Sequence, residues 1–239
     1  MNLVLDIGNS SAKFGVFQNG RMISKMGSVA HKGIVATIKN KNPQNMIVSA
    51  VGIYDNNLPE VPGRSIQLSA KTALPITLNY DTRESLGVDR MAAAVGASVL
   101  NPGNDSLIID AGSCITYDLL ESGEIFQGGI ISPGMRLRTR SMHTLTRDLP
   151  LISMEDSIGK EIPFIGKSTI ESMQSGVLYG LLGEINSVVE KYKEKSPGIR
   201  VYLCGGEAQY FEKRLKASIF AVPELVLVGL NKILEHNIS

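Results

Sequence analysis

The first part of the chain alternates short apolar runs with polar turn residues, a pattern that predicts strands joined by tight turns. Three strands are expected at Asn2–Leu5, Ala12–Phe17 and Arg21–Lys25, with turns at 6–11 and 18–20. A short helix, a buried strand and a longer helix then follow, at His31–Lys39, Asn45–Val51 and Asp89–Leu100. A helix-stop signal of Asn, Pro and Gly at 101–104 closes this series.

After that signal the same order of elements begins again. Three strands are expected at Ser106–Ile109, Cys114–Leu120 and Glu124–Ile131. Helices from Pro133 to about Leu145 and over Lys167–Lys195, a strand at Arg200–Leu203, and helices opening at Gly205-Gly206 and near Pro223 complete the chain. The mixture predicts a mixed α/β fold of two related halves, with an N-terminal domain at 1–104 and a C-terminal domain at 105–239.

Three glycines and a basic run in the second half also make predictions. Gly176, Gly180 and Gly183 share one face of the long predicted helix and indicate a close helix contact. The basic run consists of Arg136, Arg138, Arg140, His143 and Arg147. It could bind a nucleic acid or an acidic cofactor, or it could form a solvated face or a dimer contact. A solvated face or a dimer contact is the more usual role of such a stripe.

Composition narrows the class of protein. The 24 basic and 23 acidic residues give a net charge of +1, so nothing in the global charge favours nucleic acid or an anionic membrane as partner. Asp6 interrupts the N-terminal apolar run, and no apolar stretch approaches the roughly 18 residues of a membrane span. We therefore expect a cytoplasmic protein, with Cys114 and Cys204 as reduced core residues.

Two turns combine an aspartate with a glycine two positions later: Asp6-Ile7-Gly8-Asn9 and Asp110-Ala111-Gly112-Ser113. The glycine lets backbone N–H groups converge on an anion, and the carboxylate can hold a hydrated cation. Lys13 follows the first turn and can supply a positive charge for phosphoryl transfer. One such turn is common hairpin chemistry. Two turns, each opening half of the chain, indicate a pair of phosphate-binding loops.

The segment Gly87-Val88-Asp89-Arg90 ends a polar loop and opens a helix. A structural interpretation makes Asp89 the helix cap and Arg90 a surface ion-pair partner. A functional interpretation makes Asp89 a proton acceptor beside a guanidinium that holds an anionic group. The segment alone leaves both interpretations open.

The paired turns resemble those of the actin-like superfamily of ATPases and sugar kinases. In that superfamily two duplicated, ribonuclease H-like halves each supply a phosphate-binding hairpin, and ATP lies in the cleft between them. The resemblance implies a further glycine pair near adenosine, for which Cys204-Gly205-Gly206-Glu207-Ala208 is the candidate. A Gly-Gly pair between a strand and a helix is also often only a tight turn.

A narrower resemblance covers essentially the whole chain. The two aspartate turns, the Gly87–Arg90 segment, Gln127-Gly128-Gly129-Ile130, Pro133-Gly134 and the stretch from Thr169 to Gly176 occur in the order and spacing of the type III pantothenate kinases. Membership would imply phosphorylation of pantothenate to 4'-phosphopantothenate by ATP, the first step of coenzyme A biosynthesis. Ser10 and Ser113 stand where that family usually has threonine, which keeps the hydroxyl group and removes a methyl group.

The resemblance also implies roles for individual residues. The ATP-binding residues would be Asp6, Ile7, Gly8, Asn9, Ser10, Ser11, Ala12, Lys13 and Ser113. Pantothenate would contact Tyr80, Gly87, Val88, Asp89, Arg90 and Thr169, with Asp89 as the catalytic proton acceptor. Thr169 would reach in from the partner subunit of a homodimer. Asp110 would bind a monovalent cation, K⁺ or NH₄⁺, and Asp6 would hold the Mg²⁺ of ATP through water.

Two other functions fit the same scaffold. The chain could be a nucleotide-sensing regulatory protein with no acceptor substrate, although a sensor would not need the Gly87–Arg90 segment. It could also phosphorylate a different small hydroxyl compound, because one fold hosts many acceptors.

Overall fold

The computed structural model describes residues 1–8, 12–30, 33–50, 58–154, 160–216 and 218–238. These residues form two compact units. Unit 1 comprises 1–106, 119–128 and 224–239, and unit 2 comprises 107–118 and 129–223. Residues 224–239 therefore group with the N-terminal part of the chain, whereas the division expected from sequence assigned them to the second half. The division of the chain at residue 104 into two duplicated domains remains a prediction.

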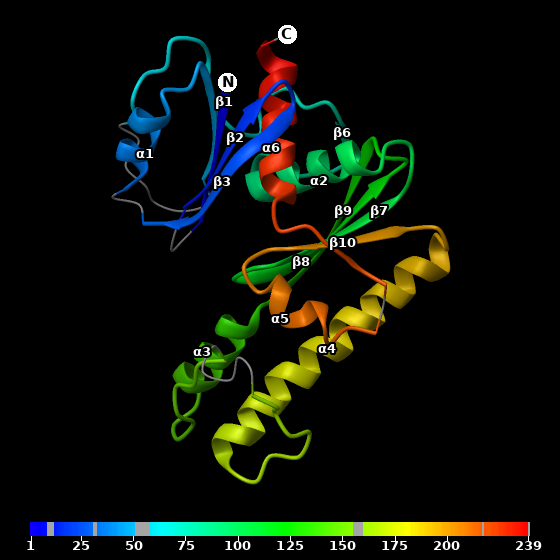
Figure 1. Ribbon diagram of the computed structural model, residues 1–239. Coiled ribbons are helices and arrows are strands. Elements are labelled where there is room, and N and C mark those ends of the chain that lie inside the picture. The colour runs from blue at the N-terminus through cyan, green and yellow to red at the C-terminus, as the bar shows by residue number, and fades with distance from the viewer. Residues whose placement is uncertain (9–11, 31–32, 51–57, 155–159, 217, 239) are drawn as a thin grey trace. The chain divides into compact units, whose positions relative to one another are not determined.

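Unit 1 is built on a five-stranded sheet with the order β3-β2-β1-β4-β5 (Figure 1). The strands are β1 (Asn2–Ile7), β2 (Ala12–Gln18), β3 (Arg21–Val29), β4 (Asn45–Ala50) and β5 (Ser65–Gln67). The first three form an antiparallel meander, and β4 and β5 add in parallel. The sequence places turn residues after the first two strands, which is why the chain folds back there.

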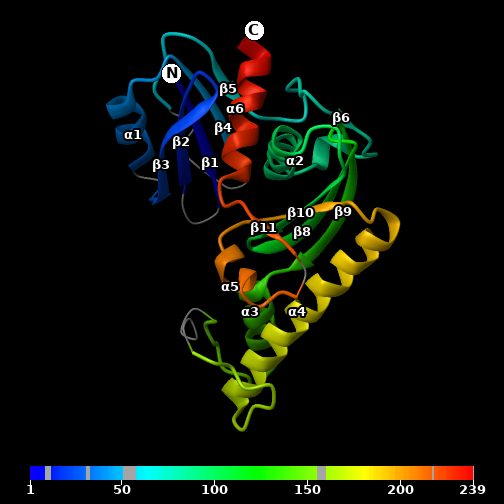
Figure 2. The same ribbon diagram turned by 45° about the vertical axis from the view of Figure 1, so that its right-hand side comes forward.

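Helices cover both faces of this sheet. On one face, α1 (Ile34–Lys41) contributes Ile34 and Ile38 to a core with alternate residues of β1 such as Leu5 (Figure 1). On the other face lie α6 (Leu225–Ile238) and, beside it, α2 (Val88–Leu100) (Figure 2). The period-2 alternation of β1 gives each face its own apolar set.

Helices α2 and α6 touch through their backbones. A Cβ atom on Gly96 would lie 2.2 Å from the carbonyl oxygen of Leu225, and one on Gly229 would lie 1.8 Å from the carbonyl oxygen of Ala92. Any side chain at either glycine would force the helices apart. The short strand β6 (Thr77–Leu78) and a 3-10 helix, η2 (Arg83–Ser85), lead into α2.

The second sheet repeats the order of the first. Its strands run β11-β10-β7-β8-β9-β6, where β7 is Ser106–Ala111, β8 Cys114–Glu121, β9 Ile125–Pro133, β10 Arg200–Cys204 and β11 Phe220–Ala221. When β6 is left out and the strands of each sheet are numbered in chain order, both sheets have the same order: third, second, first, fourth, fifth. The expected mixed α/β fold with two related halves is confirmed.

Unit 2 adds three helices, α3 (Met135–Leu145), α4 (Thr169–Lys195) and α5 (Ala208–Glu212). Glu184 of α4 joins the first two of these helices to the sheet. Its carboxylate accepts hydrogen bonds from Tyr117 (2.8 Å), Ser132 (3.0 Å) and Arg138 (2.5 Å). The Arg138 guanidinium also donates to the carbonyl oxygen of Pro133 at 2.8 Å.

Three details differ from expectation. Cys204 is buried, but Cys114 is exposed, so the core assignment of Cys114 is wrong; β8 begins at this residue, directly after the second turn. The glycine face of α4 makes no close helix contact among the described residues. A Cβ at Gly176 or Gly183 would meet nothing within 4 Å, and one at Gly180 would meet only the Arg138 guanidinium, at 3.9 Å. Finally, Arg138, a member of the basic run, forms an ion pair with Glu184.

Across the described segments, the helices are too short or too polar to span a bilayer.

Candidate active site

The first aspartate turn places three polar side chains on adjacent strands. Asp6 lies one residue before the end of β1, and its cross-strand neighbours are Lys13 of β2 and Ser49 of β4. The Ser49 hydroxyl donates to the Asp6 carboxylate at 3.4 Å. Sequence reasoning missed Ser49, although a serine near the end of an apolar strand is an available signal; the structure shows that this serine is fully buried. Asn9, Ser10 and Ser11 lie outside the described residues.

The surroundings of Asp6 change its acidity. Burial raises the pKa of the Asp6 carboxyl to about 6, Lys13 opposes that rise, and the negative charge of Asp89 adds to it. Asp89 belongs to the segment expected to bind the acceptor, so unit 1 brings part of the expected ATP loop and the expected catalytic carboxylate into electrostatic contact. Two neighbouring carboxylates beside a lysine suit a site for a hydrated Mg²⁺ and phosphate oxygens.

The Gly87–Arg90 segment opens α2, as expected. Gly87 occupies the N-cap position with no side-chain cap, and the backbone N–H of Arg90 donates to Asp89 Oδ1 at 2.9 Å. A Cβ on Gly87 would lie 2.5 Å from that same oxygen. A side chain at 87 would therefore displace the Asp89 carboxylate from its place over the first turn, where the helix dipole favours a negative charge.

Arg90 is not the surface residue of the structural interpretation. It is only 7% exposed, and its guanidinium carbon lies 5.7 Å from the ring centres of both Tyr80 and Phe126. The structure thus brings together Tyr80, Asp89 and Arg90, which the sequence assigned to the acceptor. It adds Phe126, which sequence reasoning missed because an isolated phenylalanine in a strand carries no signal beyond core packing.

The second aspartate turn, in unit 2, is enclosed by two glycine-containing segments. A Cβ on Gly205, where φ is +94°, would lie 2.5 Å from Asp110 Oδ1 and from the carbonyl oxygen of Ala111. A Cβ on Gly134, which precedes α3, would lie 2.4 Å from the carbonyl oxygen of Gly112. Gly205 therefore packs directly against the second turn, whereas a Cβ on Gly206 would meet nothing within 4 Å.

Ser113 is exposed, and its hydroxyl and the carboxylate of Asp110 are polar groups of this turn. Carboxylate and backbone carbonyl groups are oxygen donors of the kind that a hard cation takes. Thr169 lies elsewhere in unit 2, exposed at the first position of α4. There Ser168 caps the helix by accepting the backbone N–H of Glu171 at 3.2 Å.

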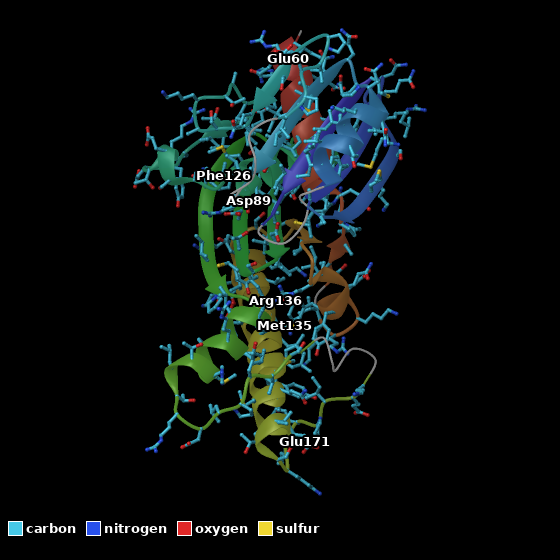
Figure 3. All side chains as sticks on the ribbon, turned by 90° about the vertical axis from the view of Figure 1, so that its left-hand side faces the viewer. Glu60, Asp89, Phe126, Met135, Arg136 and Glu171 are labelled. Atoms are coloured by element: carbon cyan, nitrogen blue, oxygen red, sulfur yellow. The ribbon has the colours of Figure 1, made fainter. Side chains whose placement is uncertain are left out.

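Figure 3 labels four of the residues that mark these places: Asp89 at the start of α2, Phe126 on β9, Arg136 on α3, and Glu171 in the first turn of α4.

Comparison with known proteins fits these observations. Residues 2–191 match the sequence model of the family described as Type III pantothenate kinase. The chain is 40% identical over 240 residues to the type III pantothenate kinase of Cytophaga hutchinsonii, covering 100% of both chains. It is 37% identical over 243 residues to that of Phocaeicola vulgatus, covering 99% of each.

Solved structures share the fold at lower identity. A conserved putative Baf family transcriptional activator from Campylobacter jejuni has a TM-score of 0.62 at 21% identity, covering 98% of both chains. A putative 2-dehydro-3-deoxygalactonokinase from Sinorhizobium meliloti has a TM-score of 0.53 at 14% identity, covering 99% of both. These likenesses confirm the actin-like, sugar-kinase type of fold. The matches in sequence extend over the whole chain, and the chain belongs to the type III pantothenate kinase family.

Proposed function

We propose that this protein transfers the γ-phosphoryl group of ATP to the primary hydroxyl of pantothenate, giving 4'-phosphopantothenate and ADP, the first step of coenzyme A biosynthesis. Family membership supports the reaction. The observation that supports the assignment of residues is that the charges of Lys13 and Asp89 both act on the carboxyl of Asp6 within unit 1. In the proposed site the proton acceptor Asp89 would then lie near the groups that hold the phosphates.

In the proposed reaction the pantothenate hydroxyl oxygen bonds to the γ-phosphorus while the bond from that phosphorus to the β,γ-bridging oxygen breaks. Asp89 takes the hydroxyl proton. Lys13 and the backbone N–H groups of the two turns stabilise the charge that spreads over the transferred group. Ser113 and the remaining residues of the 6–13 loop hold ATP.

The negative charge of pantothenate indicates which residue binds it. Pantothenate carries one carboxylate, and Arg90 is the cation of the Tyr80, Asp89 and Arg90 group. We assign the carboxylate to Arg90, whose planar guanidinium matches a carboxylate with two hydrogen bonds. Gly87 and Val88 form the adjoining backbone.

Two cations complete the proposal. Asp6 would hold Mg²⁺ through water, and Mg²⁺ neutralises phosphate charge when ATP is bound. Asp110 would hold K⁺ or NH₄⁺ beside the second turn.

A cytoplasmic homodimer is also part of the proposal. The outward face of α4 supports it, because Gly176, Gly180 and Gly183 are exposed there and Ile170 is 49% exposed. Bare glycines let a second helix approach closely. In such a dimer Thr169, exposed at the start of the same helix, is available to the acceptor site of the partner subunit.

The test is a coupled ADP-release assay with ATP, Mg²⁺ and pantothenate, run first in potassium and then in sodium alone. We expect pantothenate-dependent turnover that requires potassium. Turnover without potassium would remove the role of Asp110. No pantothenate-dependent turnover by folded protein would remove the substrate. A panel of other hydroxyl acceptors then separates a kinase of another compound from a nucleotide sensor, which would phosphorylate none of them.

A further inference from the structure

Arg90 lies beside two aromatic rings within unit 1. Its guanidinium carbon lies 5.7 Å from the ring centres of Tyr80 and Phe126, and the two rings lie 6.0 Å apart at 58°. Phe126 is fully buried and Arg90 nearly so. The electron-rich faces of both rings attract the guanidinium and favour this position of the side chain. An arginine side chain held in this way loses little further rotamer freedom when it binds a ligand.

The positions of the two rings depend on a short segment of β9. The backbone N–H of Asn79 donates to the carbonyl oxygen of Phe126 at 2.9 Å, and the Asn79 side chain donates to Gln127 at 2.6 Å. These bonds join the strand of Phe126 to the residue immediately before Tyr80. The two aromatic rings are therefore carried by one paired piece of backbone.

Gly128 fixes the position of the Tyr80 ring. Its φ is +82°, a conformation that side chains disfavour, and a Cβ there would lie 3.1 and 3.2 Å from two ring carbons of Tyr80. A methyl group at this position would both strain the backbone and push the ring away. The missing side chain of Gly128 thus lets the Tyr80 ring lie against β9, near Phe126 and Arg90.

We infer that Phe126 and Gly128 are positioning residues that preorganise Arg90 and Tyr80 for the carboxylate end of the acceptor. The inference rests on the proposed function, because it takes pantothenate as the acceptor. Neither residue needs to touch pantothenate. Phe126 acts through the guanidinium of Arg90, and Gly128 acts through the ring of Tyr80. Their loss should therefore weaken acceptor binding without weakening ATP binding or the chemical step.

The first experiment compares Phe126→Leu and Gly128→Ala with wild type by steady-state kinetics in both substrates. The KM for pantothenate should rise about tenfold in each variant, which corresponds to reordering one long side chain on binding. The KM for ATP and kcat should stay within about twofold of the wild-type values. Phe17→Leu, a buried phenylalanine of β2, is the matched control for lost core volume and should leave both KM values unchanged.

The second experiment separates positioning from general packing. If Phe126 acts through Arg90, the double variant Phe126→Leu/Arg90→Gln should have the same kcat/KM for pantothenate as Arg90→Gln alone. If the two effects multiply instead, Phe126 does not work through Arg90 and the inference is overturned. An unchanged KM for pantothenate, or equal losses for both substrates, would also overturn it.

Gly128→Ala adds only a methyl group to β9, so it keeps the test decisive if Phe126→Leu does not fold. Wild-type protein without pantothenate-dependent turnover would defeat the proposed function. Normal wild-type turnover with unaffected variants would defeat this inference alone.

Discussion

Asp6 should make the activity of this enzyme depend on pH below neutrality. Its carboxyl has a pKa of about 6 because burial disfavours the charged form. In the free enzyme about nine-tenths of Asp6 is then ionised at pH 7 and about one-tenth at pH 5. If the ionised form is needed to bind Mg²⁺ with ATP, kcat/KM for ATP should fall about tenfold over that range, because this ratio reports ionisations of the free enzyme.

The raised pKa of Asp6 should also affect the free energy of unfolding. Here the protonated form of Asp6 is the favourable one, whereas activity needs the ionised form. The folded protein binds the Asp6 proton more tightly than the unfolded chain, whose pKa is near 3.8. Its contribution to stability is therefore complete below pH 3.8 and is lost as the pH rises through about 6. Asp6→Asn carries no such proton. At pH 7 this variant should be more stable than wild type by up to about 3 kcal/mol, and at pH 4.5 by only about 1 kcal/mol.

The assays are initial rates at pH 5 to 8 under saturating pantothenate, and urea denaturation of both proteins at pH 7 and 4.5. Asparagine keeps an oxygen for the Ser49 hydrogen bond, so the comparison isolates the charge. A flat kcat/KM for ATP between pH 5 and 7, from protein that stays folded, would refute the reasoning about activity. An Asn variant no more stable than wild type at pH 7 would refute the buried-charge explanation.

Three further predictions follow from the fold. Asp89→Asn should lower kcat by about 10²–10⁴ with little change in the Kd of ATP, measured by single turnover and calorimetry; near-normal turnover would exclude Asp89 as the proton acceptor. Gly229→Ala should reduce the free energy of unfolding by about 3 kcal/mol, because its methyl group would overlap the carbonyl of Ala92, whereas Gly198→Ala, with open space around it, should stay within about 1 kcal/mol of wild type. Glu184→Ala should cost about 2 kcal/mol in urea denaturation, since it removes the shared acceptor of three side chains; an unchanged midpoint would mean that water replaces the carboxylate.

Much of this protein was readable from local sequence signals. Alternating apolar and polar residues predicted the strands, and the two Asp-x-Gly turns predicted the paired halves. The Gly87–Arg90 segment predicted the start of α2 and its acidic residue. These features depend on neighbours within a few positions, where side-chain period and glycine conformation act directly.

Only the tertiary structure decided which distant residues meet. Ser49 reaches Asp6 because β4 lies parallel to β1, and Phe126 reaches Arg90 because a strand far along the chain pairs with the segment before α2. The exposure of Cys114 likewise depends on where β8 starts in the sheet. Strand pairing and helix packing join residues far apart in the chain, and their energy comes from burying complementary surfaces, which no local pattern of residues encodes.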